Sequence, residues 1–154
     1  MTYPEALAQL DALYAQVPSL PCQGHCAQGC GPLGMSTLEH RRIRHASPRR
    51  LEGKTVACPL LKEGRCTAYK VRPMVCRLWG VTEAMVCPWG CRPARLLTIA
   101  EAETLMHAVE TVSQQQFPGQ GPRTMHPDHL IEQVQARGAQ AVAWAVLATM
   151  EPLL

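Results

Sequence analysis

Eight cysteines are the residues whose type and spacing could do chemistry in this sequence. They fall into two triplets and a pair: Cys22-x3-Cys26-x3-Cys30, Cys58-x7-Cys66-x9-Cys76 and Cys87-x3-Cys91. Four thiolates suffice to hold either a zinc ion or an iron–sulfur cluster. The eight could therefore form two four-ligand sites, or one site with four cysteines to spare.

The spacing indicates a metal without naming it. Zinc sites often use tight C-x2-4-C pairs, and the C-x3-C pairs here lie at the looser end of that rule. None of the runs matches a ferredoxin run. The sequence has no P-loop, no G-x-S-x-G and no C-x-x-C motif, so nucleotide hydrolysis, acyl transfer and thioredoxin chemistry have no sequence support. No single Cys is marked as a nucleophile.

Plain core packing and disulfide bonding account for the cysteines less well than metal binding does. Any one Cys can be an ordinary core residue, but eight confined to one Gly- and Pro-rich stretch are better understood as a coordinated set. Disulfides require an oxidising compartment, and residues 1–16 lack the basic start and apolar centre of a signal peptide. We therefore expect a cytoplasmic protein with reduced thiols. His25 is either a further ligand or a solvated loop residue.

Positive charge is concentrated around the cysteines. From Glu39 to Arg95 there are 13 Lys and Arg against 4 Asp and Glu, whereas both flanks are acidic. A buried thiolate site is an anion and needs such counter-charges. Five arginines stand within a few residues of Cys66, Cys76 or Cys91 and could supply them: Arg65, Arg72, Arg77, Arg92 and Arg95.

The same charge raises a nucleic-acid alternative. The run from Arg41 to Arg44, with Arg49 and Arg50, could contact phosphates. Basic runs are more often solvated faces, and no aromatic residues are interleaved for base stacking. Nucleic acid is therefore the weaker expectation, and an unidentified protein partner the stronger one. The longest apolar stretch, 141–150, is too short to span a bilayer, so we expect no membrane association.

The flanks of the chain are predicted to be helical. Apolar residues recur at helical spacing in 4–17, and Pro18 ends that run. Ser36 and Glu39 form a capping box for a helix to about His45. Thr98 and Glu101 form another, followed by an apolar stripe of Ile99, Ala102, Leu105, Met106, Val109 and Val112. A fourth helix is expected from near Pro127, so the helical flanks are 4–17 and 98–150.

The centre is predicted to be irregular. Two short extended pieces between Cys58 and Tyr69 would flank a Glu63-Gly64 turn, and Pro73 would open a helical turn carrying Cys76 and Trp79. The expected fold class is therefore mainly α: one small helical domain over 1–154. Irregular cysteine-bearing loops form a metal-binding centre at 22–91, with one short β-hairpin.

Several stretches together resemble a known family. They are Leu13-Tyr14, residues 21–32, Cys58-Pro59-Leu60-Leu61, Gly64-Arg65-Cys66-Thr67-Ala68-Tyr69, residues 72–80 and Cys87-Pro88-Trp89-Gly90-Cys91. This pattern resembles the YkgJ-type cysteine cluster family, also described as zinc- or iron-chelating, over roughly residues 10–105. The central run is also similar to flagellin lysine methylases, where it is associated with an iron–sulfur cluster.

The resemblance implies a set of chelating residues. By position these are Cys22, Cys26, Cys30, Cys58, Cys66 and Cys76, while Cys87 and Cys91 match a subgroup. The family's first motif is commonly C-x3-C-x2-C-C, and here Gly29 stands in place of its third Cys. Within the Arg-Pro run, Arg72 and Arg77 bracket Cys76, whose thiolate would also meet the N-terminal N–H groups of a short helix. Tyr69 is expected to pack or hydrogen-bond across the site.

These observations lead to one expectation and two alternatives. The first is a metalloprotein that holds an iron–sulfur cluster, [4Fe–4S] by preference, for electron transfer, redox sensing or support of a partner enzyme. The second is a structural zinc protein acting as an interaction module. The third is a redox or methyl-transfer enzyme that uses the cluster, although no catalytic residue can be named.

Overall fold

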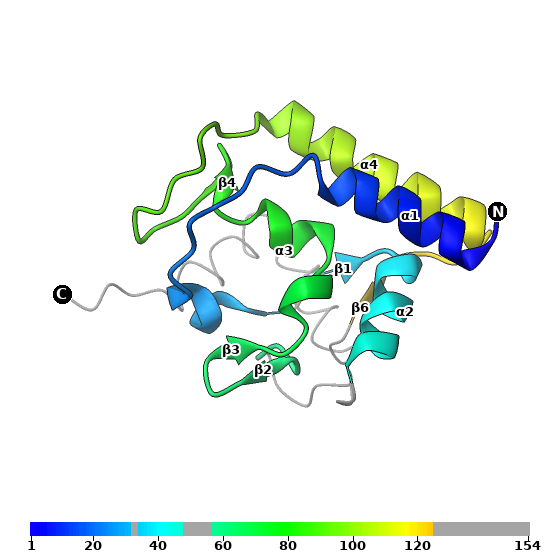
Figure 1. Cartoon of the computed structure of the whole chain (residues 1–154), viewed down its shortest axis with the longest axis horizontal. Helices are drawn as coiled ribbons and strands as arrows, with labels where there is room; N and C mark the ends of the chain where they lie inside the picture. Colours follow the sequence, from blue (N-terminus) through cyan, green and yellow to red (C-terminus); the bar gives the residue numbers. More distant parts are fainter. Residues whose placement is uncertain (32–33, 48–56, 125–154) are drawn as a thin grey trace, which may run out of the picture.

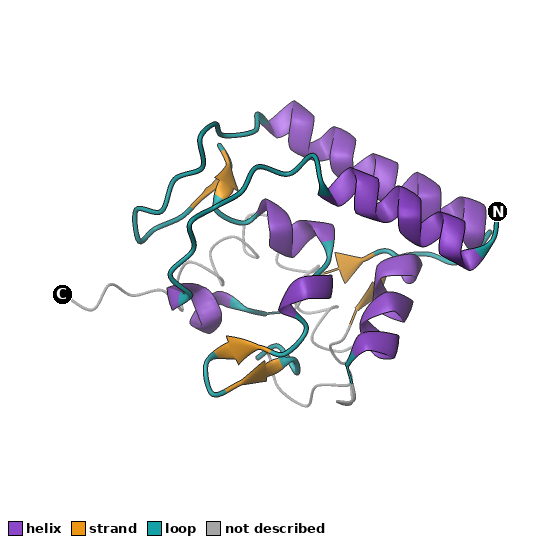
Figure 2. Ribbon diagram, viewed as in Figure 1, coloured by secondary structure: helices purple, strands orange, loops and turns teal. Residues whose placement is uncertain are grey.

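The computed structural model describes residues 1–31, 34–47 and 57–124. Within these ranges it has four α-helices: α1 (Tyr3–Tyr14), α2 (Thr37–Ala46), α3 (Met74–Leu78) and α4 (Ile99–Gln116). Two short 3-10 segments accompany them: η1 (His25–Gly29) and η2 (Tyr69–Val71). The predicted mainly helical class is confirmed in outline (Figures 1 and 2). The helix expected from Pro127 lies outside the described residues.

The strands are two residues long and pair antiparallel. They are β1 (Gly34–Met35) with β6 (Arg123–Thr124), β2 (Leu61–Lys62) with β3 (Arg65–Cys66), and β4 (Val81–Thr82) with β5 (Met85–Val86). The predicted hairpin around Glu63-Gly64 is present as β2–β3. The β4–β5 hairpin and the β1–β6 pair were not predicted.

Local sequence signals set the helix starts. Ser36 caps α2 and Thr98 caps α4, each in the predicted capping box with Glu39 or Glu101. Thr2 and Glu5 form a third box at the start of α1. In every case the side-chain oxygen of the cap accepts an N–H that has no partner within the helix, which stabilises the first turn.

The main core lies between α1 and α4, which run side by side in opposite directions, with α3 beneath them (Figure 1). Its fully buried residues come from all four helices and include Leu10, Leu38, Met74, Leu78 and Val109. The predicted stripe of α4 is confirmed at its inward positions. The prediction was wrong for Ile99, the first residue of α4, which is 54% exposed and lies outside the core that begins at Ala102 and Leu105.

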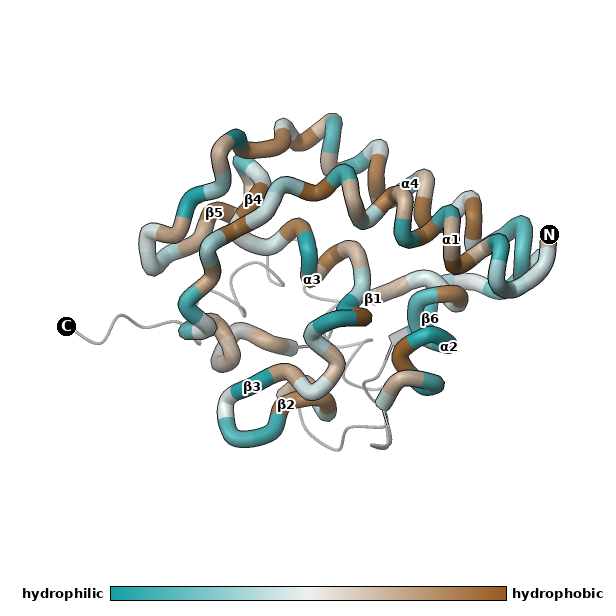
Figure 3. Tube along the Cα trace, in the orientation of Figure 1, coloured by the Kyte–Doolittle hydropathy of each residue, from teal (hydrophilic) through white to brown (hydrophobic). Residues whose placement is uncertain are grey.

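A second, smaller core supports the cysteine-bearing centre. It consists of Met35, Ile43, Leu60 and Ala68, with Cys58, Cys66 and Val71 packed against it. Figure 3 shows α2 as a mostly hydrophilic helix interrupted by hydrophobic positions. Ile43 and Leu38 on that inward side are buried in the second and the main core respectively, so α2 links the two cores.

One buried carboxylate ties three helices together. Glu39 of α2 is 1% exposed, and its Oε1 accepts hydrogen bonds from the Tyr14 hydroxyl at 2.9 Å and the Met74 N–H at 2.7 Å. Its Oε2 accepts the N–H and the hydroxyl of Ser36, each at 2.9 Å. Tyr14 belongs to α1 and Met74 to α3, so one side chain fixes the relative positions of α1, α2 and α3.

Among the described helices, none combines the length and apolar character needed to cross a bilayer.

Candidate metal centre

Three of the eight cysteines lie on adjoining pieces of backbone. The Cys58 N–H donates to the Cys30 carbonyl at 3.2 Å, which joins the end of η1 to the segment before β2. Cys66 of β3 faces Leu61 of β2 in the hairpin register. Cys58 and Cys66 also pack on the second core. The first and second cysteine triplets of the sequence therefore meet.

The β2–β3 hairpin has a local cause. Glu63 has φ 51° and Gly64 has φ 74°, and two successive left-handed residues make the tight turn that matches the twist of paired strands. Beyond it, the Leu60 carbonyl accepts the N–H and the hydroxyl of Thr67, at 2.9 and 2.8 Å. These bonds hold the strand of Cys66 beside the chain that follows Cys58.

Cys76 reaches the same region from α3. Pro73 precedes this helix as predicted, and the Cys76 N–H donates to the Pro73 carbonyl at 3.0 Å. The free N–H at the helix start, that of Met74, donates to Glu39 and not to a thiol. The N–H groups of Met74 and Cys76 thus have other partners, and Glu39 fixes the first residue of the helix that carries Cys76.

Four thiols, those of Cys30, Cys58, Cys66 and Cys76, are linked by their effects on one another's pKa. Burial, and after it the nearby thiolates of Cys30, Cys58 and Cys66, raise the pKa of Cys76 to about 12. Burial is also the main cause that raises the pKa of Cys30 to about 12, with Cys58 the next cause and smaller effects of Cys26 and Cys66. Charges act in this way only over short separations in a poorly solvated site. We call Cys30, Cys58, Cys66 and Cys76 the first set.

Arg72 is the basic residue that acts on the first set. Its positive charge lowers the pKa of Cys76, against the larger effect of burial. The guanidinium lies over the Tyr69 ring at 4.0 Å, and its Nε is buried with no hydrogen-bond acceptor among the described residues. A buried donor without a partner is costly, so an acceptor such as a cluster sulfur would suit this position.

The other predicted arginines have different contacts. Arg77 stacks on Tyr14 at 3.9 Å and donates to the carbonyls of Arg72 and Lys70, so it braces the frame around η2 and α3. Arg92 donates to the carbonyls of Cys87 and Cys91, at 2.9 and 3.0 Å. Arg95 forms an ion pair with Glu101. Arg65 is exposed on β3.

The remaining cysteines gather around η1 and the loop after β5. The pKa of Cys26 is raised by burial, then by Cys22 and, more weakly, by Cys87. The rings of His25 and Trp89 lie 6.2 Å apart, which brings η1 beside the loop between Cys87 and Cys91. Cys87 and Cys91 are buried, and Arg92 closes their loop. We call Cys22, Cys26, Cys87 and Cys91 the second set.

His25 and Tyr69 are both exposed. His25 contacts the Gln23 side chain at 3.3 Å and the Trp89 ring. Tyr69 supports the Arg72 guanidinium, which agrees with the predicted packing role. Within the described ranges, no three His, Cys, Asp or Glu side chains are gathered closely enough to hold a metal ion. All eight cysteines are free thiols.

The donors of the first set are thiols, the chemical type that binds zinc and iron, while their spacing in the described residues does not form a closed site. Soft sulfur ligands, poor solvation, a nearby guanidinium and a buried unpartnered donor all suit an anionic cluster. The sequence did not predict that Glu39 binds the first N–H of α3, the helix that carries Cys76. The only sequence signal for Glu39 was the capping box, which explains its bonds to Ser36 but says nothing of Tyr14 or Met74.

Comparison of this chain with protein-family models, with curated proteins and with solved structures found no match.

Proposed function

We propose that this chain is a cysteine-ligated metalloprotein whose first set, Cys30, Cys58, Cys66 and Cys76, holds a [4Fe–4S] cluster. The observation that carries the proposal is the backbone bond that joins the Cys30 and Cys58 segments, beside which Cys30, Cys58 and Cys66 each raise the pKa of Cys76. When bound, such a cluster supplies one-electron redox chemistry.

The raised thiol pKa values are compatible with metal binding, although protons compete with a metal for these thiols. A thiol with a pKa of about 12 is neutral at physiological pH, because its thiolate is poorly solvated and repelled by neighbouring thiolates. A bound metal cation reverses that balance, since thiolates are the ligating form and protons are released on binding. Neutral thiols on adjoining segments are therefore the form expected for these cysteines without a metal.

Iron is favoured over zinc for three reasons. Tight zinc-type pairs are absent from the sequence, and positive charge surrounds the cysteines. The third reason is the motif resemblance of the Arg-Pro-x-x-Cys-Arg run to flagellin lysine methylases and to the YkgJ-type family. Arg72, with a buried Nε that lacks an acceptor among the described residues, would donate toward the cluster and favour its reduced form.

The second set is a candidate second centre. Cys26 is influenced by Cys22 and Cys87, and Arg92 holds the loop of Cys87 and Cys91 closed. This site would account for all eight cysteines. Trp89 beside it is 41% exposed, which suits a surface where a protein partner receives or delivers an electron.

The proposed role is electron transfer, redox sensing or support of a partner enzyme in the cytoplasm. A structural zinc module is the alternative, and a cluster-dependent redox or methyl-transfer enzyme is another. Metal analysis after anaerobic purification distinguishes a cluster protein from the zinc module. We expect brown protein that absorbs near 400 nm and contains iron and acid-labile sulfide. Colourless protein with stoichiometric zinc and no iron would contradict the cluster proposal and support the structural zinc module.

A further inference from the structure

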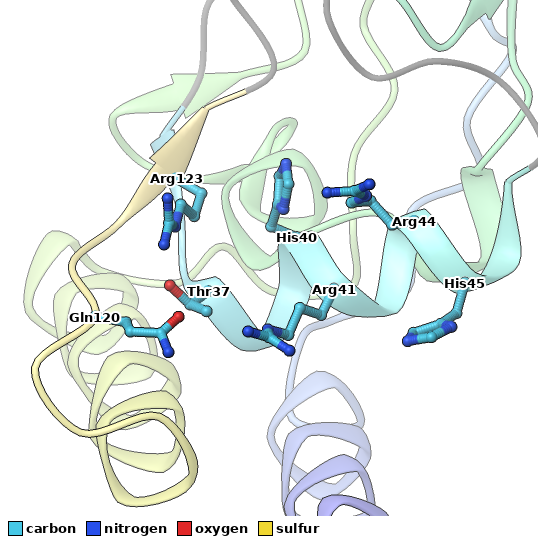
Figure 4. Close-up of a pocket in the computed structure, with 7 residues that line it drawn as sticks. All are labelled: Thr37, His40, Arg41, Arg44, His45, Gln120 and Arg123. Atoms are coloured by element: carbon cyan, nitrogen blue, oxygen red, sulfur yellow. The ribbon is translucent and has the colours of Figure 1, made fainter.

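A basic pocket lies on the face of α2 that does not contribute to the cores. Its volume is about 500 Å³, within the range of small-molecule sites. Five of its lining residues belong to α2, namely Thr37, His40, Arg41, Arg44 and His45. They recur at intervals of three and four, so they share one side of the helix (Figure 4).

The far wall comes from the segment after α4. Pairing of β1 with β6 places Arg123 opposite Met35, immediately before α2. The Thr37 hydroxyl donates to the Gly121 carbonyl at 2.8 Å, and the Gln114 side chain donates to the Gln120 carbonyl at 2.7 Å. Gln120 and Arg123 complete the lining, as Figure 4 shows. The pocket is thus held by backbone pairing and by two hydrogen bonds.

The lining carries positive charge and no acidic residue. Among the described residues, the guanidinium groups of Arg44 and Arg123 have neither an ion-pair nor a hydrogen-bond partner. Arg41 is supported by the Phe117 ring, 4.4 Å from its guanidinium carbon. Three arginines with few competing contacts are well suited to bind an anion.

The neighbouring arginine of the same run shows the contrast. Arg42 forms a 2.6 Å ion pair with Asp11 and lies over the Tyr14 ring. It belongs to the frame that joins α2 to α1. The basic run noted in the sequence therefore divides, with Arg41 and Arg44 lining the pocket and Arg42 facing away from it.

We propose that this pocket binds a small phosphate compound with at least two negative charges, for which ADP serves as the probe. Arginine forks match the paired oxygens of phosphate, and the three guanidinium charges balance a diphosphate. A polynucleotide would need a basic groove that follows its backbone together with stacking aromatics. The proposal is independent of any metal bound by the cysteines.

Calorimetric titration of the full chain with ADP at about 50 mM salt tests the proposal, because phosphate contacts are strongest at low salt. The variant R44Q/R123Q removes two pocket charges. The control K62Q/K70Q removes two charges from exposed lysines outside the pocket. We expect the native chain and the control to bind ADP alike, and R44Q/R123Q to bind at least about tenfold more weakly. Adenosine without phosphate should not bind.

Three results would overturn the proposal. One is absence of ADP binding by the native chain. Another is equal weakening in both variants, which would mean attraction by overall charge alone. The third is much tighter binding of a short single-stranded oligonucleotide than of ADP, with the same dependence on Arg44 and Arg123, which would assign the pocket to a nucleic-acid backbone. Inorganic tripolyphosphate as a further probe should bind and compete with ADP if phosphate recognition is responsible.

Discussion

The Cys58 N–H donates to the Cys30 carbonyl across 3.2 Å, which joins two cysteine segments separated in the chain by the whole of α2. This bond places the last cysteine of the first triplet beside the first of the second. With Cys66 across the β2–β3 hairpin and Cys76 on α3, it brings donors from distant parts of the sequence into one region. The functional proposal depends on this arrangement.

Removal of the Glu39 carboxylate should destabilise the protein strongly. E39A leaves the Tyr14 hydroxyl and the Met74 N–H buried without an acceptor, along with both donors of Ser36. We expect a loss of at least about 3 kcal/mol in the free energy of unfolding, measured by urea denaturation. Y14F, which removes one of these buried bonds, should cost about 1–3 kcal/mol.

The control for Y14F is Y69F, because Tyr69 is 48% exposed and no hydrogen bond of its hydroxyl is found among the described residues. It should leave unfolding unchanged within about 0.5 kcal/mol. Equal stability of E39A and the native chain would contradict the role assigned to Glu39.

The sequence predicted contacts that are local and missed those that are not. Ser36 with Glu39 and Glu63 with Gly64 were found because their signals span at most four residues. The bonds from Glu39 to Tyr14 and Met74 join three helices, and no spacing rule encodes them. The β4–β5 hairpin was missed because its turn residues, Glu83 and Ala84, give no turn signal.

The same limit applies to the candidate site. The sequence marked all eight cysteines but could not divide them, because the division depends on which loops pack together. The proposed division rests on the ring contact of His25 with Trp89 and on the Cys58–Cys30 bond. Arg72 and Arg77 were equivalent in the motif, yet Arg77 stacks on Tyr14 and only Arg72 acts on Cys76.

Replacement of Arg72 should therefore change the redox behaviour of the bound cluster. R72Q removes the positive charge that favours the anionic form of Cys76, so the reduction potential should fall relative to the native protein. Redox titration followed by absorbance measures it. R95Q is the matched control, since Arg95 is exposed and paired with Glu101, and it should leave the potential unchanged. A lower reduction potential in R95Q but not in R72Q would contradict the assignment of Arg72 as the arginine that acts on the cluster.

Gly80 is placed where the backbone conformation and a close neighbour both favour glycine. It has φ 86°, and a Cβ there would lie 2.6 Å from Leu20 Cδ2 and 3.5 Å from Cys87 Cβ. G80A should destabilise the protein by about 1–3 kcal/mol, from backbone strain and the displacement of Leu20. Gly24 has a similar φ of 77° but nothing within 4 Å. G24A therefore carries the backbone strain alone, and thermal unfolding should show it to be the milder change.

The start of α4 should be sensitive to acid. Hydrogen bonding to Arg95 and to the Thr98 N–H lowers the pKa of Glu101 to about 2. A depressed carboxyl pKa means that its stabilising effect is complete above the ordinary value of about 4.5 and is lost as the pH falls toward 2. NMR titration of the Glu101 carboxyl carbon should show this midpoint. In R95Q the midpoint should move upward, and an unchanged midpoint would exclude Arg95 as its cause.

The most direct test of the proposed centre is the iron and acid-labile sulfide content of anaerobically purified serine variants. C58S, C66S and C76S each remove a first-set thiol, whereas C22S and C91S remove second-set thiols and serve as controls. We predict that each first-set variant loses the 400 nm absorption of the first cluster. C22S and C91S should keep it, with a reduced iron content if the second set is also occupied. Full retention in C58S, C66S and C76S, or loss confined to C22S and C91S, would contradict the assignment of the cluster to the first set.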